Sequence, residues 1–529
     1  MALMGKGLRY SFFLSFVSGI LFFLGIFHWI LEVPKYTLLH HAILASYLGS
    51  YFGFFGLVFN FISLRCGMTI GFFAAPFIWV SLEYIRSNLS FLALPWALLA
   101  HSQYQYPSVI QIASLTGAYS ISFLIVMVNS ALAALIYSFL FHPHPHPPPS
   151  KGEGEEKGFP SFKGENKGQA SLSETVRRRE VFSLKLKRKG TLSLVITSGI
   201  LLLFALIYGH YTISQPITGQ PIKLSLVQGN IEQGKKWDPR YAREIMDTYS
   251  KLTQEALKHQ PDLVIWPETA TPGSITLDSR LYAEISDIVR STETPLLLGS
   301  AQYRKFEGKG PIELKYSNSA YLIHRETEII KNQRYDKIRL FPFGEYLPYK
   351  EIIPWSLIGV SDSDNYMSGK EFTVFSLTPF RFGVTICWEN LFPDLFRHFI
   401  RNGAQFMINI TNEARFGETA APYQLVSISI FRAVENRVFV IRCANTGVSC
   451  IINPYGRILD RVKDEKGKDI FVRGVMSGQV IPLESKTIYT RYGDILVWVA
   501  LIGAAGFLTV AWWRSRAKRD ENEALLKGP

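Results

Sequence analysis

The chain has 529 residues, of which 48% are hydrophobic and 14% aromatic, and its formal net charge is +13. This length exceeds that of one ordinary domain, so more than one structural unit is expected. Much of the basic excess lies in residues 151–190 and in the C-terminal tail, next to long apolar segments, where basic residues set membrane topology. Composition therefore argues against nucleic acid as a partner and favours a membrane protein.

The apolar residues form segments that are long enough to cross a membrane as helices. They cover about residues 8–31, 38–64, 68–86, 108–141, 191–212 and 492–513. The first segment is longer than the apolar core of a signal peptide, so it is predicted to be a retained transmembrane helix. The predicted units are about four helices in 1–141, one helix in 191–214, a globular domain in 215–490, and a last helix with a basic tail in 491–529.

Residues 142–190 separate the fourth and fifth apolar segments and have a different composition. His-Pro repeats lead into a stretch rich in Gly, Lys, Glu and Ser, which is followed by Arg177, Arg178 and Arg179. Such a composition cannot bury a core and predicts a disordered basic linker.

The basic residues also predict the orientation of the chain. Lys6, Arg65, the 142–190 linker and the C-terminal tail all fall on one face of a membrane that is crossed six times. The positive-inside rule makes that face the cytoplasm. Residues 215–490 then lie on the opposite face, which is the periplasm if the membrane is the inner membrane of a bacterium.

The 215–490 domain alternates strand and helix patterns. Predicted strands cover 222–228, 262–266, 296–299, 382–387, 406–411 and 438–442, with a hairpin formed by 321–323 and 328–331. Predicted helices cover 239–259, 281–289, 394–401 and 424–437. Helices between strands of this length predict a layered α/β fold.

The four cysteines lack the regular spacing of a disulfide framework or a zinc site, so no metal and no cofactor are expected. Cys443 and Cys450 flank a turn-like segment and could pair in an oxidising compartment. Unpaired thiols are the favoured prediction.

Three stretches of the domain carry reactive side chains at or near strand ends. Glu268 closes the apolar run 264–266, Lys337 follows Tyr-Asp, and Cys387 ends a run that begins at Phe382. Each one alone is ordinarily structural: a carboxylate in a surface turn, a solvated lysine, or a small buried thiol. Together they supply a base, a cation for an oxyanion and a nucleophile, which is the set that covalent catalysis by cysteine needs.

These stretches resemble the nitrilase superfamily of carbon–nitrogen hydrolases, and the flanking apolar helices extend the resemblance to the apolipoprotein N-acyltransferases. The further matching residues are Pro76, Trp79, Glu83, Arg86, Pro95, Trp96, Gln111, Gln228, Gly229, Asn230, Lys236, Trp237, Asp238, Pro239, Asn412, Arg432, Glu435, Ala444, Asn445, Thr446 and Gly447. The resemblance implies an α-β-β-α sandwich inserted between transmembrane helices, with Glu268, Lys337 and Cys387 as the catalytic triad.

The resemblance further implies a two-step transfer by a monomer without a cofactor. Glu268 would take the proton of Cys387, and the thiolate would attack the sn-1 ester of a membrane phospholipid while Lys337 stabilises the oxyanion. The resulting thioester would react with the α-amine of the S-diacylglyceryl cysteine of an apolipoprotein.

Four other residues receive roles from the resemblance. Glu345 would be a second essential carboxylate that supports Lys337 and the base. Trp237, Trp388 and Glu389 would line the acyl and substrate entrance, although the two tryptophans could equally be interfacial anchors or core residues.

The chain also departs from the family pattern. The family usually has eight membrane helices, and the first apolar segment here resembles the third of them; a start site placed too late or a shortened variant would both explain this. Arg415 stands where the family commonly has an aromatic residue, and Trp388 where Tyr is common. These differences leave the triad intact and concern the preference for lipid and lipoprotein.

Three other functions compete with acyl transfer. A membrane-tethered amidase or nitrile hydrolase would use the same triad with water, but a water-soluble substrate needs no flanking helices. A non-catalytic membrane scaffold is disfavoured by the intact triad. A Cys–His protease would need His398, on the predicted helix after Cys387, to contact the thiol.

Overall fold

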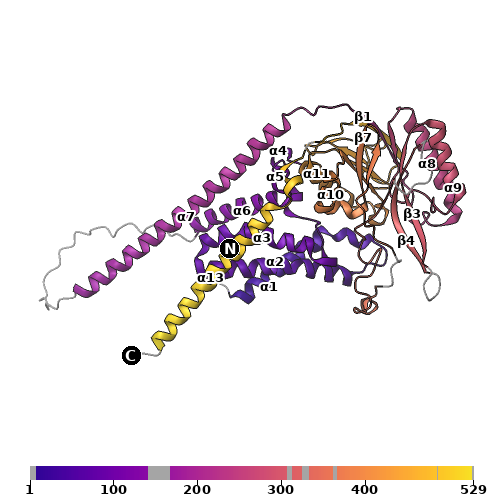
Figure 1. Ribbon diagram of the computed structural model, residues 1–529. Helices are drawn as coiled ribbons and strands as arrows, with labels where there is room; N and C mark the ends of the chain where they lie inside the picture. The colour runs from indigo at the N-terminus through magenta and orange to yellow at the C-terminus, as the bar shows by residue number, and fades with distance from the viewer. Residues whose placement is uncertain are drawn as a thin grey trace.

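The computed structural model describes residues 7–140, 167–306, 313–324, 333–360, 366–484 and 486–526. A bundle of long helices and an α/β domain lie side by side (Figure 1). The first helices and the last one belong to the bundle, and the α/β domain is inserted between them in the sequence.

The described residues contain six helices that are long and apolar enough to cross a membrane, which confirms the six predicted segments. They are α1 (Leu8–Ile26), α2 (Leu38–Cys66), α3 (Met68–Asn88), α6 (Tyr119–Leu140), α7 (Lys167–Ile213) and α13 (Ile495–Leu526). Close approach of α1 and α2 depends on small residues, since a Cβ on Gly49 would lie 2.9 Å from the backbone nitrogen of Ile20. The chain is a multi-pass membrane protein.

Helix α7 differs from the sequence prediction. Residues 142–166 of the predicted linker lie outside the described residues, but α7 already begins at Lys167, well before the predicted start at residue 191. The prediction of disorder for residues 167–190 is therefore wrong, because these residues are helical. The physical reason is that Lys, Arg, Glu and Gln favour helix when a following apolar segment supplies a helix that they can extend.

The α/β domain is built on two six-stranded sheets. One sheet has the order β12-β1-β2-β3-β4-β5 and the other has the order β11-β10-β9-β8-β7-β6. The strands are β1 (Ile222–Gln228), β2 (Leu263–Ile265), β3 (Leu296–Phe306), β4 (Glu313–Ile323), β5 (Arg334–Asp336), β6 (Val374–Leu377), β7 (Phe380–Ile386), β8 (Phe406–Thr411), β9 (Val440–Ala444), β10 (Cys450–Ile452), β11 (Ile458–Arg461) and β12 (Gly474–Val480). Parallel pairing joins β1, β2 and β3 in one sheet and β7, β8 and β9 in the other.

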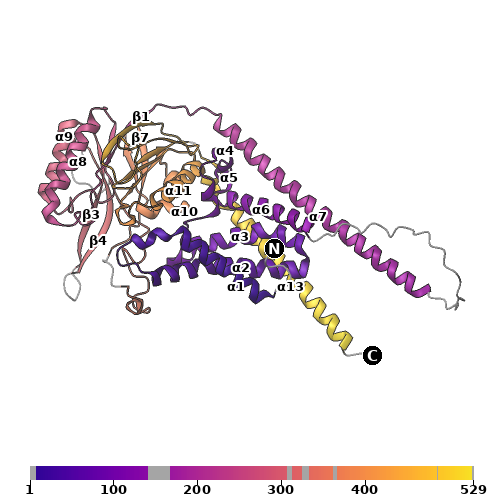
Figure 2. The same ribbon diagram turned by 180° about the vertical axis from the view of Figure 1, so that it is seen from behind.

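Alternating side chains give each sheet two buried faces. Leu263 and Ile265 belong to the core between the sheets, whereas Val264 and Trp266 belong to the core beneath α8 (Ala242–Leu257) and α9 (Ser279–Thr292). The other sheet is covered by α10 (Pro393–Arg401) and α11 (Ala421–Asn436), which lie between it and the helical bundle (Figures 1 and 2). The predicted α-β-β-α sandwich between membrane helices is confirmed.

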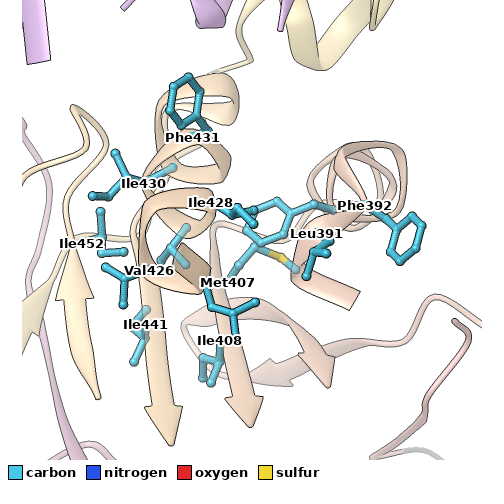
Figure 3. Close-up of a cluster of buried hydrophobic side chains, with 14 of the residues drawn as sticks. Leu391, Phe392, Met407, Ile408, Val426, Ile428, Ile430, Phe431, Ile441 and Ile452 are labelled. Carbon is cyan, nitrogen blue, oxygen red and sulfur yellow. The ribbon is translucent and has the colours of Figure 1, made fainter. Parts of the chain in front are cut away.

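Helix α11 is buried on several sides. Val426, Ile428 and Ile430 gather with side chains of the strands below them, among which Ile408 and Ile441 are labelled in Figure 3. This apolar packing fixes α11 on the second sheet.

The same helix bonds to the membrane part of the chain. The Gln424 side-chain oxygen accepts from the indole nitrogens of Trp29 at 3.2 Å and Trp96 at 2.9 Å. Just after α11, Arg437 donates to Gln111 and to the Ser114 hydroxyl. These bonds hold the α/β domain against the outer ends of the membrane helices.

Most predicted strands and helices of the domain are confirmed within a few residues. The predicted 328–331 strand lies outside the described residues, and β4 pairs instead with β3 and β5. Cys443 and Cys450 are free thiols, as favoured from the sequence.

Candidate active site

The three predicted catalytic residues follow strands whose ends meet at one place in the sandwich. Glu268 follows β2, Lys337 follows β5, and Cys387 follows β7 of the other sheet. Because β2 and β7 each run parallel to a neighbour, their carboxyl ends are the edge where a site forms in such folds. The structure therefore brings together the base, the cation and the thiol from both sheets.

Lys337 lies at the centre of an ionic cluster. Its ammonium, with the side chain 1% exposed, donates to Glu345 Oε1 at 2.8 Å and lies 3.9 Å from Glu268 Oε1. Burial opposes the charge of Lys337, but the Glu345 and Glu268 carboxylates help to outweigh it and raise the pKa of the ammonium. Glu345 Oε2 accepts from the backbone nitrogen of Phe341 at 2.7 Å, which fixes the carboxylate.

Two other groups hold the Glu268 carboxylate. The Asn318 side chain of β4 donates to Oε1 at 2.6 Å, and the Asn412 backbone nitrogen donates to Oε2 at 2.7 Å. Asn412 follows β8, so Glu268 of one sheet is fastened to the other sheet. The carboxylate is thus oriented on both oxygens.

Cys387 adopts a left-handed backbone conformation with φ of +57°. This region costs a non-glycine residue about 1–3 kcal/mol and occurs at functional sites. The strain is held in place because the Asn409 side chain donates to the Cys387 carbonyl at 3.1 Å, while Arg442 donates to Asn409 Oδ1 at 2.9 Å. Asn409 and Arg442 therefore fix the backbone of Cys387.

The surroundings of Cys387 favour the protonated thiol over the thiolate. Burial raises the pKa of Cys387 to about 12, the Glu268 carboxylate adds to the rise, and the Lys337 ammonium opposes it. A thiol in this state needs a base when it attacks. The electrostatic effect of Glu268 on the thiol shows that this carboxylate lies near Cys387, as the predicted role of a base requires.

Glu389 does not line an entrance, which corrects the sequence prediction. Its side chain is fully buried and accepts from the backbone nitrogens of Ile338 at 2.7 Å, Arg339 at 2.9 Å and Ile386 at 2.8 Å. It also accepts from the Tyr335 hydroxyl at 2.8 Å. Glu389 is a carboxylate that joins the segment carrying Lys337 to the strand carrying Cys387.

The two predicted tryptophans differ in exposure. Trp388 is buried, donates to the carbonyl of Arg339, and packs edge-on against Phe341 and Phe392 at 5.0 Å. Trp237 is 42% exposed and follows the buried Lys236. Trp388 therefore packs inside the domain beside the site, whereas the Trp237 side chain is exposed on the surface of the domain.

His398 lies elsewhere. His398 is on helix α10, and its ring stacks on Phe372 at a centroid distance of 4.9 Å. The groups that act electrostatically on Cys387 are instead carboxylates and Lys337. The geometry thus gives no support to the hypothesis of a Cys–His protease. Within the described ranges, no group of three or more His, Cys, Asp or Glu is arranged to hold a metal ion.

Sequence reasoning missed Lys236 as a site residue. The side chain is 3% exposed, and Nζ donates to the backbone carbonyl of Glu268 at 2.9 Å. Burial lowers its pKa to about 8; Glu268 and Cys387 oppose this shift, and Arg415 adds to it. The only sequence signal was its place in the Lys236-Trp237-Asp238-Pro239 motif. Lys236 does not follow an apolar strand, which was the feature that marked the other site residues.

Comparison with known proteins covers both parts of the chain. Residues 1–131 match the family described as apolipoprotein N-acyltransferase N-terminal domain, and residues 223–483 match the carbon-nitrogen hydrolase family. The chain is similar to the apolipoprotein N-acyltransferase of Geobacter metallireducens, with 33% identity over 519 residues that cover 96% of this chain and 88% of that protein. The protein of the same name from Chlorobaculum tepidum is 28% identical over 482 residues, covering 86% and 79%.

Among solved structures, an amidase from Nesterenkonia sp. matches with 18% identity and a TM-score of 0.37. The match covers 51% of this chain and 93% of the amidase.

The raised pKa of Cys387 predicts its reactivity toward iodoacetamide. The thiolate fraction should rise about tenfold per pH unit below the pKa, so the alkylation rate at Cys387 should climb from about pH 7 to about pH 10 without a plateau. Mass spectrometry of the Cys387 peptide measures the rate, and Cys387→Ala gives the background from Cys66. A plateau near neutral pH would contradict the protonated resting thiol.

Glu389→Gln is predicted to destabilise the protein. Glutamine has one acceptor oxygen and would turn its NH₂ group toward backbone N–H donors, at a cost of about 2–3 kcal/mol for the groups left unpaired. Denaturant unfolding of the solubilised chain measures this change. Glu418→Gln, which removes an exposed pairing with Lys468, is the control and should have little effect. Equal effects of the two variants would refute the positioning role.

Proposed function

This chain belongs to the apolipoprotein N-acyltransferase family, and we propose that it moves the sn-1 acyl chain of a membrane phospholipid onto the N-terminal α-amine of an S-diacylglyceryl-cysteine apolipoprotein through a thioester on Cys387. Membership of the family makes the chain an acyltransferase of lipoprotein N-acylation. The phospholipid donor, the apolipoprotein acceptor and the covalent intermediate are the proposed parts.

One observation supports this proposal most directly: the Glu268–Lys337–Cys387 cluster lies in a domain that docks on membrane helices through the segments around the site. Asn412 binds Glu268, and Phe416, a few residues later, packs on Trp29 at 5.0 Å. Trp29 follows α1 at the end of a membrane span. The loop that holds Glu268 therefore also contacts the end of a membrane span, the place from which a lipid ester would approach.

In the first step, Glu268 accepts the proton from Cys387 Sγ while the thiolate attacks the sn-1 carbonyl carbon. The tetrahedral oxyanion is stabilised by the Lys337 ammonium, which Glu345 holds in place. When the C–O bond breaks, Glu268 returns its proton to the leaving oxygen, so the lysophospholipid departs with a free sn-1 hydroxyl and the acyl group stays on sulfur as a thioester.

In the second step, the free α-amine of the diacylglyceryl cysteine attacks the thioester carbonyl. Glu268 accepts a proton from the nitrogen, the C–S bond breaks, and the proton passes to the Cys387 thiolate. The products are an amide and the resting thiol. One carboxylate serves both steps because each step begins and ends with the same protonation state.

The proposed setting follows the distribution of charge and of apolar helices. The basic segments lie in the cytoplasm and the 215–490 domain lies in the periplasm of the bacterial inner membrane, where both lipid substrates meet the domain. The proposed units are the 1–141 helices, the α7 helix over Lys167–Ile213, the 215–490 domain and the 491–529 helix and tail. The proposed enzyme acts as a monomer, and Trp237 and Trp388 border the substrate path.

The intermediate can be tested by intact-mass spectrometry of the full chain in detergent. Incubation with a phospholipid of uniform acyl chains should add one acyl group to the enzyme, and the adduct should map to Cys387. Adding a diacylglyceryl-cysteine peptide should remove the group from the enzyme and add it to the peptide. Cys387→Ser should abolish peptide acylation.

Cys66→Ala is the matched control, because this thiol is also partly exposed but lies at the end of α2. It should keep both the adduct and the transfer. Release of free fatty acid without acylation of the peptide would favour a hydrolase and contradict the proposal.

A further inference from the structure

A row of polar side chains crosses the second sheet beside the nucleophile. This polar row consists of Thr385 of β7, Asn409 of β8 and Arg442 of β9, which are register partners on neighbouring strands. The Asn409 side chain donates to the carbonyls of Thr385 and Cys387, each at 3.1 Å. Arg442 in turn donates to Asn409 Oδ1 at 2.9 Å. Because all three side chains are buried, the polar row is a fixed support for the end of β7.

The far end of the polar row is an ion pair. The Arg442 guanidinium donates to the Glu413 carboxylate, and the two side chains are 1% and 0% exposed. A buried charge that loses its partner is strongly unfavourable, so each member of such a pair holds the other in place. The orientation of Asn409 against the Cys387 carbonyl therefore depends on Glu413.

Glu413 also belongs to the segment that holds the predicted base. It follows Asn412, whose backbone nitrogen donates to Glu268 Oε2 at 2.7 Å. Glu413 is thus connected to Cys387 through the polar row and to Glu268 through the adjoining peptide unit. Since Cys387 and Glu268 follow strands of different sheets, this connection fixes one relative to the other.

The surroundings of Glu413 leave its side chain little freedom. A Cβ atom on Gly447 would overlap the Glu413 carboxylate, so the glycine backbone lies directly against it. Arg442 holds the same carboxylate through its guanidinium. In a close-packed interior, a group held in this way cannot move without displacing its neighbours.

We propose that the Glu413–Arg442 ion pair is a positioning device for acyl transfer, which holds the Cys387 thiol in the alignment with Glu268 that proton transfer needs. The inference rests on the proposed function of the Cys387 site. The left-handed backbone of Cys387, with φ of +57°, is unfavourable for a residue with a side chain and would relax if Asn409 released its carbonyl. Because Glu268 accepts a proton in both steps, the ion pair acts on thioester formation and on amide formation.

The charge of Glu413 separates this role from an effect on thiolate formation. Glu413 is one of the carboxylates that raise the pKa of Cys387. Removal of its charge would lower that pKa and make the thiolate easier to form. Alkylation by a small reagent needs only the thiolate, so it should become faster or stay the same. Acylation by a lipid ester also needs alignment with Glu268, so it should become slower.

The test measures single-turnover acylation of Cys387 by intact mass, with the full chain in detergent and dipalmitoyl phosphatidylglycerol as the donor. Glu413→Gln keeps the shape of the side chain and should lower the acylation rate at saturating donor about a hundredfold. The KM for the donor should stay unchanged, because misalignment affects the reaction and not binding. Alkylation of Cys387 by iodoacetamide at about pH 8 should be no slower than in the wild type.

Gly447→Ala tests the same geometry without a change of charge. Its added methyl group displaces the Glu413 carboxylate, so acylation should again be slower while alkylation of Cys387 stays at the wild-type rate. Unfolding temperatures show that each variant is folded under the conditions of the assay. If Glu413→Gln does not fold, Gly447→Ala decides between the outcomes.

Glu435→Gln is the matched control. Glu435 pairs with Arg432 at 2.8 Å, and both side chains are 1% exposed, so this is an equally buried ion pair of the same domain. Its other bond is to the backbone nitrogen of Ala118 in the membrane part. Glu435→Gln should lower the unfolding temperature to a similar extent as Glu413→Gln but leave the acylation rate nearly unchanged.

The outcomes distinguish the two proposals. If the donor does not acylate Cys387 in the wild type, the proposed function fails. If folded Glu413→Gln and Gly447→Ala are acylated at the wild-type rate, the positioning role is refuted while the proposed function stands. A slower alkylation, a raised KM as the main effect, or an equal loss of acylation in Glu435→Gln would also overturn the inference.

Discussion

The buried Lys337 ammonium is the constraint on which the site depends. With 1% of its side chain exposed, it needs both Glu345 and Glu268, because an unpaired buried charge would cost about 3–5 kcal/mol. Two carboxylates around one ammonium leave a net negative charge, and this disfavours the thiolate of Cys387. The surroundings therefore favour the protonated Cys387 thiol close to the Glu268 carboxylate, and the Lys236 ammonium is a second cation on which Glu268 acts.

Helix α11 connects this site to the membrane. Its apolar side packs on the strands that lead to Asn409 and Asn412, while Gln424 near its start bonds to Trp29 and Trp96. A helix that is buried on both sides cannot shift toward one partner without breaking contacts with the other. The position of the membrane helices is thus coupled to the strand ends that hold Cys387 and Glu268.

Much of the fold could be predicted from the sequence, because strong periodicity marks the central elements. Strands β1 and β8 have the predicted bounds, and the six apolar segments are long enough to be unmistakable. The strands at or near the sheet edges, such as β6, β11 and β12, are short or interrupted by polar residues and were missed. The helical part of residues 167–190 was missed because the prediction relied on the polar composition of the segment and not on the helix propensity of its Lys, Arg, Glu and Gln residues.

Glu268, Lys337 and Cys387 could be selected from the sequence as one cluster because each closes or follows a strand and resembles a known pattern. The role of Glu389 was wrong, since a sequence cannot show that three backbone nitrogens from two segments converge on one carboxylate. Lys236 was missed as a site residue for the same reason: its partner is the backbone carbonyl of Glu268, and backbone partners leave no sequence signal. Contacts that join distant segments through main-chain atoms are set by the fold alone.

The loop after β8 carries three different contacts within a few residues. The Asn412 backbone holds the Glu268 carboxylate, the Asn412 side chain bonds to Gln233 of the loop after β1, and Phe416 packs on Trp29 and Trp96 of the membrane part. Moving this loop to suit another lipid would displace Glu268, so its backbone cannot vary freely. Arg415 between them is exposed and makes none of these contacts, so its side chain can change without disturbing the Glu268 carboxylate.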